Sequence, residues 1–136
     1  MHLVDTNVIS ELMRQRPDPG VLSWLERHQT VFPKLTISAV TVDEISYGLT
    51  RRPTQRLLAW FNTVVLNQDT LPVTADIARR AGELRAQLET RGSSRSQADM
   101  MIAATAQLHG LTIVTRNVRD FDGCGVGLLN PFLEQV

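Results

Sequence analysis

The stretch that decides the fold is the opening segment LVDTNVISEL, residues 3–12, in which a strand pattern changes directly into a helix pattern. Leu3 and Val4 form a short apolar run that ends at Asp5, and the apolar residues after it recur at helical spacing. The segment therefore predicts a strand, a turn and a helix, with an acid where the strand ends. Ligands of open α/β sheets bind at this end of the strands.

The same alternation of strand and helix continues along the chain. Apolar patterns and Gly or Pro breaks predict helices over about residues 21–27, 38–49, 54–67, 74–91 and 96–109, and strands over about 35–37, 71–73, 111–115 and 126–129. Gly110 is expected to end the last helix in the left-handed conformation. Strands that alternate with helices pair in parallel. The predicted fold class is α/β, a three-layer α/β/α sandwich with a central, mainly parallel sheet of four to five strands.

Composition excludes several classes of protein. With 136 residues, 43% of them apolar, the chain has the size and core-forming content of one soluble domain. Its 14 basic residues balance its 14 acidic ones, so no net charge draws it to nucleic acid or lipid. The single Cys124 excludes an intramolecular disulfide. No membrane span or signal peptide is recognisable, and we expect a cytoplasmic protein with no membrane partner.

Acidic side chains gather where the predicted strands end. Asp5 follows the first strand, Glu44 lies in the helix after the second, and Asp99 opens the helix before the strand at 111–115. Asn117 and Asp120 follow that strand. Neighbouring parallel strands would bring these side chains to one edge, where several carboxylates need a cation to remain ionised together. An oxygen-only donor set favours Mg²⁺ or Mn²⁺.

Each acid also has a structural interpretation. Asp5 is suited to cap the helix that follows it. The pairs Thr41 with Glu44 and Ser96 with Asp99 have the spacing of a capping box, and Asp120 suits a turn. Capping does not explain why the acids follow apolar strands at one end of the sheet, so we favour the interpretation as a site.

Four segments resemble the motifs of PIN-domain nucleases, and more narrowly those of VapC-type toxins of bacterial toxin–antitoxin pairs, including the FitB-like branch: residues 3–11, 37–45, 98–106 and 114–121. Each motif is weak alone, but their order and spacing are specific, and the resemblance extends to residues 129–132. It implies one PIN-like nuclease domain over residues 1–136.

The resemblance also implies an activity, partners and site residues. It implies a Mg²⁺- or Mn²⁺-dependent endoribonuclease that leaves a 5′-phosphate and a 3′-hydroxyl, acts on RNA, binds a small cognate antitoxin and forms a homodimer. Carried onto matching positions, it implies metal ligation by Asp5, Glu44, Asp99 and Asp120. Asn117 occupies the position where some relatives place the last acid. The side chains placed to contact a substrate phosphate are Thr6, Asn7, Thr115, Arg95 and Arg116.

Two surfaces are expected to bind proteins. The helix at 54–67 carries Leu57, Trp60 and Phe61 on an apolar arc wider than one buried stripe requires, which indicates an interface. The antitoxin implied by the resemblance is expected to lie beside the helices that carry Glu44 and Trp60, with a basic residue in place of the cation.

Other functions remain as alternatives. A metal-dependent phosphatase of the haloacid dehalogenase type also has an Asp after its first strand, but Asn7 stands where that chemistry needs a second Asp. A receiver domain needs a lysine after a late strand, and Lys34 precedes the second one. The glycines at 123–127 do not open a helix, which argues against a dinucleotide fingerprint. A catalytically silent RNA-binding module, or a PIN-like module of a DNA-binding complex, is the alternative outside enzymes.

Overall fold

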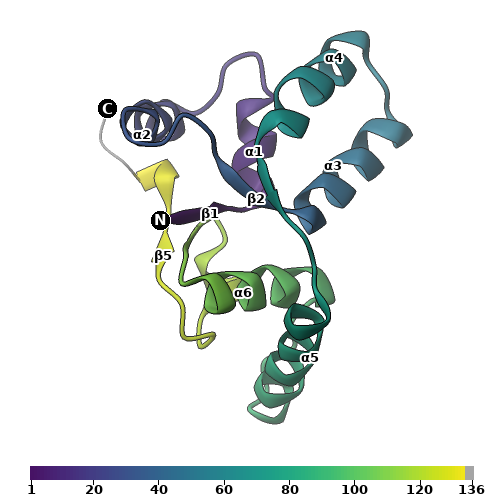
Figure 1. The fold of residues 1–136 in the computed structure, drawn as a ribbon, viewed down its shortest axis with the longest axis vertical. Helices are drawn as coiled ribbons and strands as arrows, with labels where there is room; N and C mark the ends of the chain where they lie inside the picture. The colour runs from purple at the N-terminus through teal and green to yellow at the C-terminus, as the bar shows by residue number, and fades with distance from the viewer. Residues whose placement is uncertain (134–136) are drawn as a thin grey trace.

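Short parallel strands separate two layers of helices in the computed structural model, which describes residues 1–133 (Figure 1). The strands are β1 (His2–Val4), β2 (Thr36–Ser38), β3 (Asp69–Leu71), β4 (Thr112–Val114) and β5 (Leu128–Leu129). The helices are α1 (Thr6–Leu12), α2 (Pro19–Gln29), α3 (Ala39–Arg51), α4 (Gln55–Thr63), α5 (Ala75–Thr90) and α6 (Gln97–His109). Single 3-10 turns are η1 (Val65–Asn67), η2 (Val118–Phe121) and η3 (Pro131–Leu133). Residues 134–136 of the expected domain lie outside the described part.

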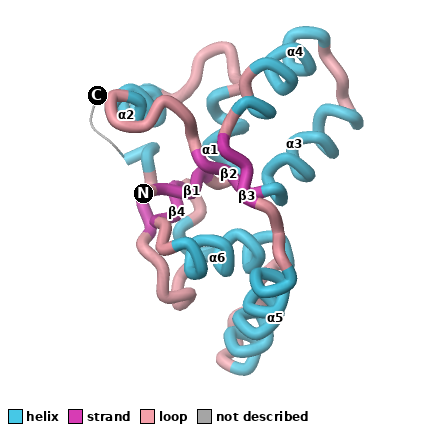
Figure 2. The backbone as a smooth tube through the Cα atoms, viewed as in Figure 1, coloured by secondary structure: helices cyan, strands magenta, loops and turns pink. Residues whose placement is uncertain are grey.

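The strands form two parallel ladders. In the first, β4 pairs with β1 on one side and with β5 on the other, so that Ile113 lies opposite both Leu3 and Leu128. In the second, β2 pairs with β3, with Ile37 opposite Thr70. Strands β1 and β2 contact each other, which brings the ladders together in the middle of the molecule (Figure 2). Every pairing is parallel, as the alternation of strands and helices predicted.

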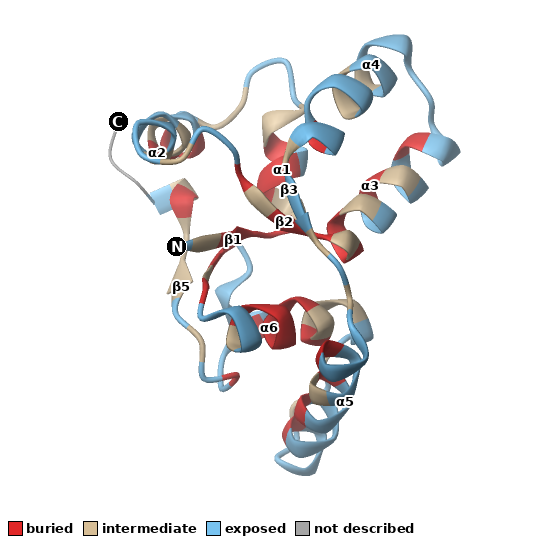
Figure 3. Cartoon of the chain, viewed as in Figure 1, coloured by how far each residue is buried: buried red, intermediate tan, exposed pale blue. Residues whose placement is uncertain are grey.

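Two apolar cores cover the opposite faces of the sheet. Successive side chains of a strand point to opposite faces. Leu3 and Ile113 accordingly pack with residues of α5 and α6, whereas Val4 and Val114 pack with residues of α1, α2 and α3. Figure 3 shows the buried residues that run through β1 and α6. This arrangement confirms the three-layer sandwich.

Helix boundaries follow the local capping signals in most places. Ser96 caps α6 by accepting a hydrogen bond from the backbone N–H of Asp99 at 3.0 Å. Gly110 ends the same helix with φ of 64°, a left-handed conformation that glycine adopts without steric cost. Both expectations are confirmed. No helix within residues 1–133 is long and apolar enough to cross a membrane.

The predicted helix over 54–67 is wrong in its last four residues, of which 65–67 form the 3-10 turn η1. Helix α4 ends at Thr63, and β3 covers residues 69–71 rather than 71–73. The cause is pairing to β2: the Asp69 N–H donates to the Leu35 carbonyl at 2.9 Å, and the Gln68 side-chain oxygen accepts from the Leu35 N–H at 2.8 Å. These bonds fix Gln68 and Asp69 beside β2, so β3 begins two residues earlier than predicted. Pro72 has no N–H to continue the strand.

The alternative interpretation of Thr41 and Glu44 as a capping box is wrong. Ser38 is the N-cap of α3, where its hydroxyl oxygen accepts from the Val40 N–H at 3.0 Å. Thr41 therefore lies inside the first turn, fully buried, and Glu44 has no capping role. This leaves the Glu44 carboxylate available to the edge of the sheet.

Candidate active site

Asp5 is a buried carboxylate held by donors from two strand ends. Its side chain is only 5% exposed. Oδ1 accepts from the Thr6 N–H at 2.8 Å, which confirms that Asp5 caps α1. Oδ2 accepts from Nδ2 of Asn7 at 2.9 Å and from the Thr115 hydroxyl at 2.8 Å. The carboxylate is thus held at the point where β1 ends.

The environment of Asp5 opposes its negative charge. Burial, helped by the charges of Asp99 and Glu44, raises the pKa of Asp5 from 3.8 to about 6, against the lowering effect of the hydrogen bonds from Thr115 and Thr6. Desolvation and neighbouring like charges both disfavour an ionised carboxylate. A bound cation would relieve both penalties.

Glu44 approaches this site from α3. The Thr6 hydroxyl donates to Oε1 of Glu44 at 2.6 Å, and the hydroxyl of Thr41 lies 3.0 Å from the same Thr6 oxygen. Thr6, the residue after Asp5, therefore links α1 to α3, the helix that follows β2. This contact ties the ends of β1 and β2 together at one edge of the sheet, as the positions of the acids predicted.

Asp99 approaches from the other layer of the sandwich, in the first turn of α6. Its pKa is raised, chiefly by burial and then by the charges of Asp120 and Glu44, while Ser96 and Arg95 act in the opposite direction. Asp120 lies in the turn η2 after β4. The structure thus places the charges of all the predicted acids near enough to act on Asp5 or Asp99.

The donor chemistry fits a hard divalent cation. Asp5, Glu44, Asp99 and Asp120 offer only oxygen atoms, which Mg²⁺ and Mn²⁺ prefer. Their side chains share an electrostatic neighbourhood rather than a tight cluster: within residues 1–133 no group of three or more His, Cys, Asp or Glu side chains is gathered closely enough to hold a metal ion. Burial and neighbouring like charges raise the pKa of both Asp5 and Asp99, and a bound cation would offset both effects.

Asn117 and Asp120, the two candidates for the fourth residue of the site, differ in their surroundings. Asp120 acts on Asp99 through its charge. Asn117 immediately precedes the turn η2 without a side-chain capping hydrogen bond, and its backbone N–H donates to the Thr115 hydroxyl oxygen at 3.0 Å. Of the two, Asp120 carries the charge that acts on Asp99, whereas Asn117 is neutral.

The predicted phosphate contacts fall into two groups, and Thr6 belongs to the first because its hydroxyl donates to Glu44. Asn7 and Thr115 are used inside the protein: besides holding Asp5, Asn7 donates to Thr115 at 3.1 Å and accepts from the Arg116 N–H at 3.1 Å. The two arginines flank the site. Arg95 donates to the Asp120 carbonyl at 2.6 Å, and the Arg116 guanidinium lies 4.6 Å from the centre of the Phe132 ring.

Sequence reasoning missed Glu11, which is a second buried acid, only 7% exposed. Its carboxylate accepts from the Asp18 N–H at 2.8 Å and from the Arg14 guanidinium at 3.3 Å. A signal was present, because Glu11 lies three residues after the buried Val8 and therefore shares the inner face of α1. Glu11 fixes the loop between α1 and α2 beside the site.

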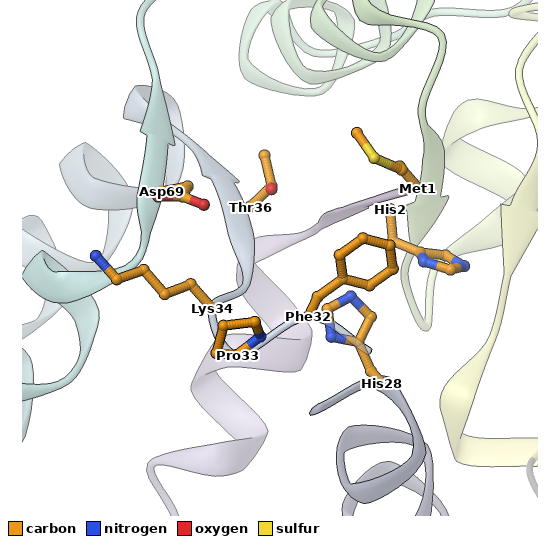
Figure 4. Close-up of a pocket in the computed structure, with 8 residues that line it drawn as sticks. All are labelled: Met1, His2, His28, Phe32, Pro33, Lys34, Thr36 and Asp69. Carbon is orange, nitrogen blue, oxygen red and sulfur yellow. The ribbon is translucent and has the colours of Figure 1, made fainter. Parts of the chain in front are cut away.

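A separate cavity of about 290 Å³ opens at the opposite edge of the sheet (Figure 4). It borders the residues where strands begin, including His2 and Thr36, whereas the carboxylates follow the strand ends. The rings of His2 and His28 lie 5.5 Å apart beside Phe32, and burial lowers the pKa of both histidines. These neutral histidines belong to an aromatic cluster and are not near the candidate site.

Comparison with known proteins agrees with this geometry. The family model described as PIN domain matches residues 2–123. The chain is 35% identical over 139 residues to the VapC ribonuclease Y4jK of Sinorhizobium fredii, covering 97% of this chain and 98% of that protein. It is also 35% identical over 144 residues to the toxin FitB of Neisseria gonorrhoeae, covering 97% and 99%. The crystal structure of FitAcB from Neisseria gonorrhoeae superposes with a TM-score of 0.86 at 31% identity, covering 98% of this chain and 99% of that one.

Proposed function

Because this chain belongs to the PIN-domain family, we propose that it is the ribonuclease toxin of a toxin–antitoxin pair and hydrolyses RNA phosphodiester bonds with Mg²⁺ or Mn²⁺. The observation that carries this proposal is the buried Asp5, whose pKa is raised to about 6 beside Asp99 and Glu44. Residues 1–136 act in this proposal as one nuclease domain, in the cytoplasm where its RNA is found.

In this mechanism Asp5, Glu44, Asp99 and Asp120 would hold the cation. When bound, such a cation lowers the pKa of a coordinated water and neutralises charge on the phosphate. The other residues of the site orient these carboxylates. Three donors orient Asp5, the Thr6 hydroxyl orients Glu44, and Arg95 holds the turn that carries Asp120. The carboxylates would repel the phosphate at this site until the cation is present, so cleavage depends on that ion.

Cleavage of single-stranded RNA, measured with and without Mg²⁺ or Mn²⁺, tests the activity. Asp99→Asn should abolish the metal-dependent cleavage while the protein stays folded. A matched control is Asp76→Asn, because Asp76 lies in the first turn of α5 as Asp99 does in α6. Equal cleavage by the two variants would contradict the site. Release of inorganic phosphate from a phosphomonoester without RNA cleavage would favour a phosphatase. RNA binding without either activity would favour a silent module.

Asn117→Ala and Asp120→Ala separate the two candidates for the last position. We expect Asp120→Ala to weaken Mn²⁺ binding and cleavage more strongly, because the charge of Asp120 acts on Asp99 and Asn117 is neutral. Equal and negligible losses would mean that only the acids at 5, 44 and 99 matter.

We infer that a cognate antitoxin binds along two neighbouring hollows. One, of about 260 Å³, is lined mainly by apolar side chains of α1, α2 and α4, including Leu12, Leu25 and Trp60. The other, of about 270 Å³, lies between α1, α3 and the start of α4 and includes Glu44. An apolar segment in the first hollow would bring a basic side chain to Glu44 through the second. The relatives with solved structures include toxin–antitoxin complexes from Klebsiella pneumoniae and Salmonella typhimurium, the latter bound to DNA.

A binding titration with the antitoxin at several Mg²⁺ concentrations and constant ionic strength tests this mode of inhibition. Affinity should fall as Mg²⁺ rises, because the cation and the basic side chain compete for the same oxygens. The Asp99→Asn variant should show a weaker dependence on Mg²⁺. Affinity that responds to neither change would leave only blocked access of RNA as the mechanism.

We also propose a homodimer through α4 and the turn η1. Leu57, Trp60 and Phe61 are half-buried against the core, while Leu58, Val64 and Leu66 of the same segment are 39%, 36% and 49% exposed. These exposed apolar side chains form the surface that a second copy of the chain would cover. Light scattering at micromolar concentration should show a dimer that Leu58→Glu dissociates. A monomeric wild type would contradict this assembly.

A further inference from the structure

A third hollow lies directly beside the Asp5 site and differs from the others in its charge. Its volume is about 390 Å³, and Arg14, Arg16, Arg116 and Phe132 lie along it. The volume falls within the range of pockets that hold small organic ligands, about 300 to 1,000 Å³. It is formed by the loop between α1 and α2, by Arg116 two residues after β4, and by the turn η3. We call it the arginine pocket.

The arginine pocket is positive despite the acids on its wall. The Asp18 carboxylate caps α2, where it accepts from the N–H groups of Gly20 at 2.9 Å and Val21 at 3.2 Å. The Glu11 carboxylate is committed to Arg14 and to the Asp18 N–H. Within residues 1–133 neither Arg16 nor Arg116 has a carboxylate at ion-pair distance. Two guanidinium groups are therefore available to an anion.

The pocket also contains a flat stacking surface. The Arg116 guanidinium lies over the Phe132 ring, with 4.6 Å from its carbon to the ring centre. Guanidinium planes and aromatic rings are the surfaces on which unpaired bases stack. A positive group together with a stacking surface matches the two parts of a nucleotide, its phosphate and its base.

A short chain of contacts links the pocket to Asp5. The Arg116 N–H donates to Oδ1 of Asn7 at 3.1 Å, and Nδ2 of Asn7 donates to Asp5 at 2.9 Å. One side chain therefore contacts both the backbone of the arginine pocket and the buried carboxylate. A nucleotide in the pocket would be a direct neighbour of a phosphate held at Asp5.

We propose that the arginine pocket binds the nucleotide next to the cleaved phosphate of a single-stranded RNA, an inference that rests on the proposed function. Arg16 binds the phosphate of this nucleotide, and the Arg116–Phe132 pair stacks its base. Stacking tolerates every base, so the pocket sets how tightly the strand is held and which bond is presented for cleavage, with little preference for sequence. Glu11 is a positioning residue, since it holds the loop that carries Arg14 and Arg16.

The test measures RNA binding and cleavage separately. Binding of a fluorescent single-stranded RNA of mixed sequence is measured by anisotropy in the Asp99→Asn background at several salt concentrations. Arg16→Ala should weaken binding about 5- to 10-fold and reduce the salt slope by roughly one, as loss of one phosphate contact does. Phe132→Leu should weaken binding about 5-fold or more with an unchanged salt slope, because stacking carries no charge. Phe132→Tyr keeps an aromatic ring and should bind like its parent.

The control is Arg79→Ala on α5, where the Arg79 side chain is 81% exposed and pairs, among residues 1–133, only with Glu83 at 3.5 Å. It should leave RNA affinity unchanged. In otherwise wild-type protein, Arg16→Ala and Phe132→Leu should raise KM for RNA with kcat nearly retained. Circular dichroism of each variant checks that it is folded.

The outcomes separate this inference from the proposed function. Absence of cleavage by the wild type would contradict the nuclease, whereas the anisotropy series would still test the pocket. Unchanged affinity and KM in Arg16→Ala and Phe132→Leu, in a protein that does cleave RNA, would overturn the arginine pocket alone. An equal loss in Arg79→Ala would also overturn it, because it would show that binding depends only on overall charge.

Discussion

The Thr115 hydroxyl donates to Oδ2 of Asp5 at 2.8 Å, across a separation of 110 residues in the chain. Each residue directly follows a strand, Asp5 after β1 and Thr115 after β4, and these strands pair in parallel. The bond is fully inside the protein, so it both fixes the carboxylate and limits how far its pKa is raised. The carboxyl ends of adjacent strands thus build the site jointly.

Thr115→Val should raise the pKa of Asp5 above its present value of about 6, because a hydrogen bond that favours the ionised form is lost. It should also cost about 1 to 3 kcal/mol of unfolding free energy, since Nδ2 of Asn7 and the Asn117 N–H lose an acceptor. The carboxyl carbon shift of Asp5 in an NMR titration and urea unfolding check the two effects. Thr105→Val is the control, because its buried hydroxyl bonds to the Met101 carbonyl within α6. An unshifted Asp5 would contradict the role of Thr115.

Asp99→Asn should lower the pKa of Asp5 in the metal-free protein. The charge of Asp99 is one of the causes that raise this pKa, and asparagine removes it. The cap of α6 is kept, because Ser96 accepts from the backbone of residue 99 and not from its side chain. The same NMR titration checks the shift, with Asp76→Asn as the control. A pKa that stays at its wild-type value would show that the charge of Asp99 does not act on Asp5.

Asp5→Asn should gain stability relative to the wild type as pH rises. The folded pKa of about 6 exceeds the unfolded 3.8, so the folded state binds the proton more tightly, and ionised Asp5 destabilises the fold above pH 6. The cost is absent below pH 3.8 and grows between pH 4 and pH 6 toward an upper limit of about 3 kcal/mol. Urea unfolding of both proteins between pH 4.5 and about 7.5 measures the difference. A difference that does not vary with pH would contradict the prediction.

The comparison with Asp5→Asn is needed because two histidines change the stability of the wild type with pH in the same range as Asp5 and with the opposite sign. Burial lowers the pKa of His2 and His28, so both are neutral in the fold and bind protons more readily when unfolded. Their contribution to stability is present above the unfolded pKa of 6.5 and is lost as pH falls below it. These histidines are the same in both proteins, so the difference between the two curves reports Asp5.

Glu11→Ala should destabilise the protein by about 1 to 3 kcal/mol and loosen the loop before α2. The buried carboxylate accepts from the Asp18 N–H at 2.8 Å, and its removal leaves that donor without its partner. Urea unfolding gives the stability, and hydrogen exchange at the Asp18 amide gives the local effect. Glu26→Ala, which removes an exposed acid from α2, is the control. Slow exchange retained at Asp18 would show that the loop is held by other contacts.

Much of the fold is readable from local patterns in the chain. The change from strand to helix at Asp5, the cap at Ser96 and the glycine at 110 depend on neighbours within a few residues, and the structure has each of them. The boundary between α4 and β3 was wrong because it depends on pairing with Leu35, about 30 residues earlier. Local periodicity contains no information about such a partner.

For the site, the sequence by itself determined which acids follow strands, because parallel strands end at a common edge whatever their order. Only the tertiary structure decided what each side chain does there. It buried Asp5 between Asn7 and Thr115, gave the Thr6 hydroxyl to Glu44, and turned Glu11 inward to hold the arginine pocket. These roles depend on which strands are neighbours and how deeply each carboxylate is desolvated. Both are properties of the packed chain, set by contacts between residues far apart in sequence.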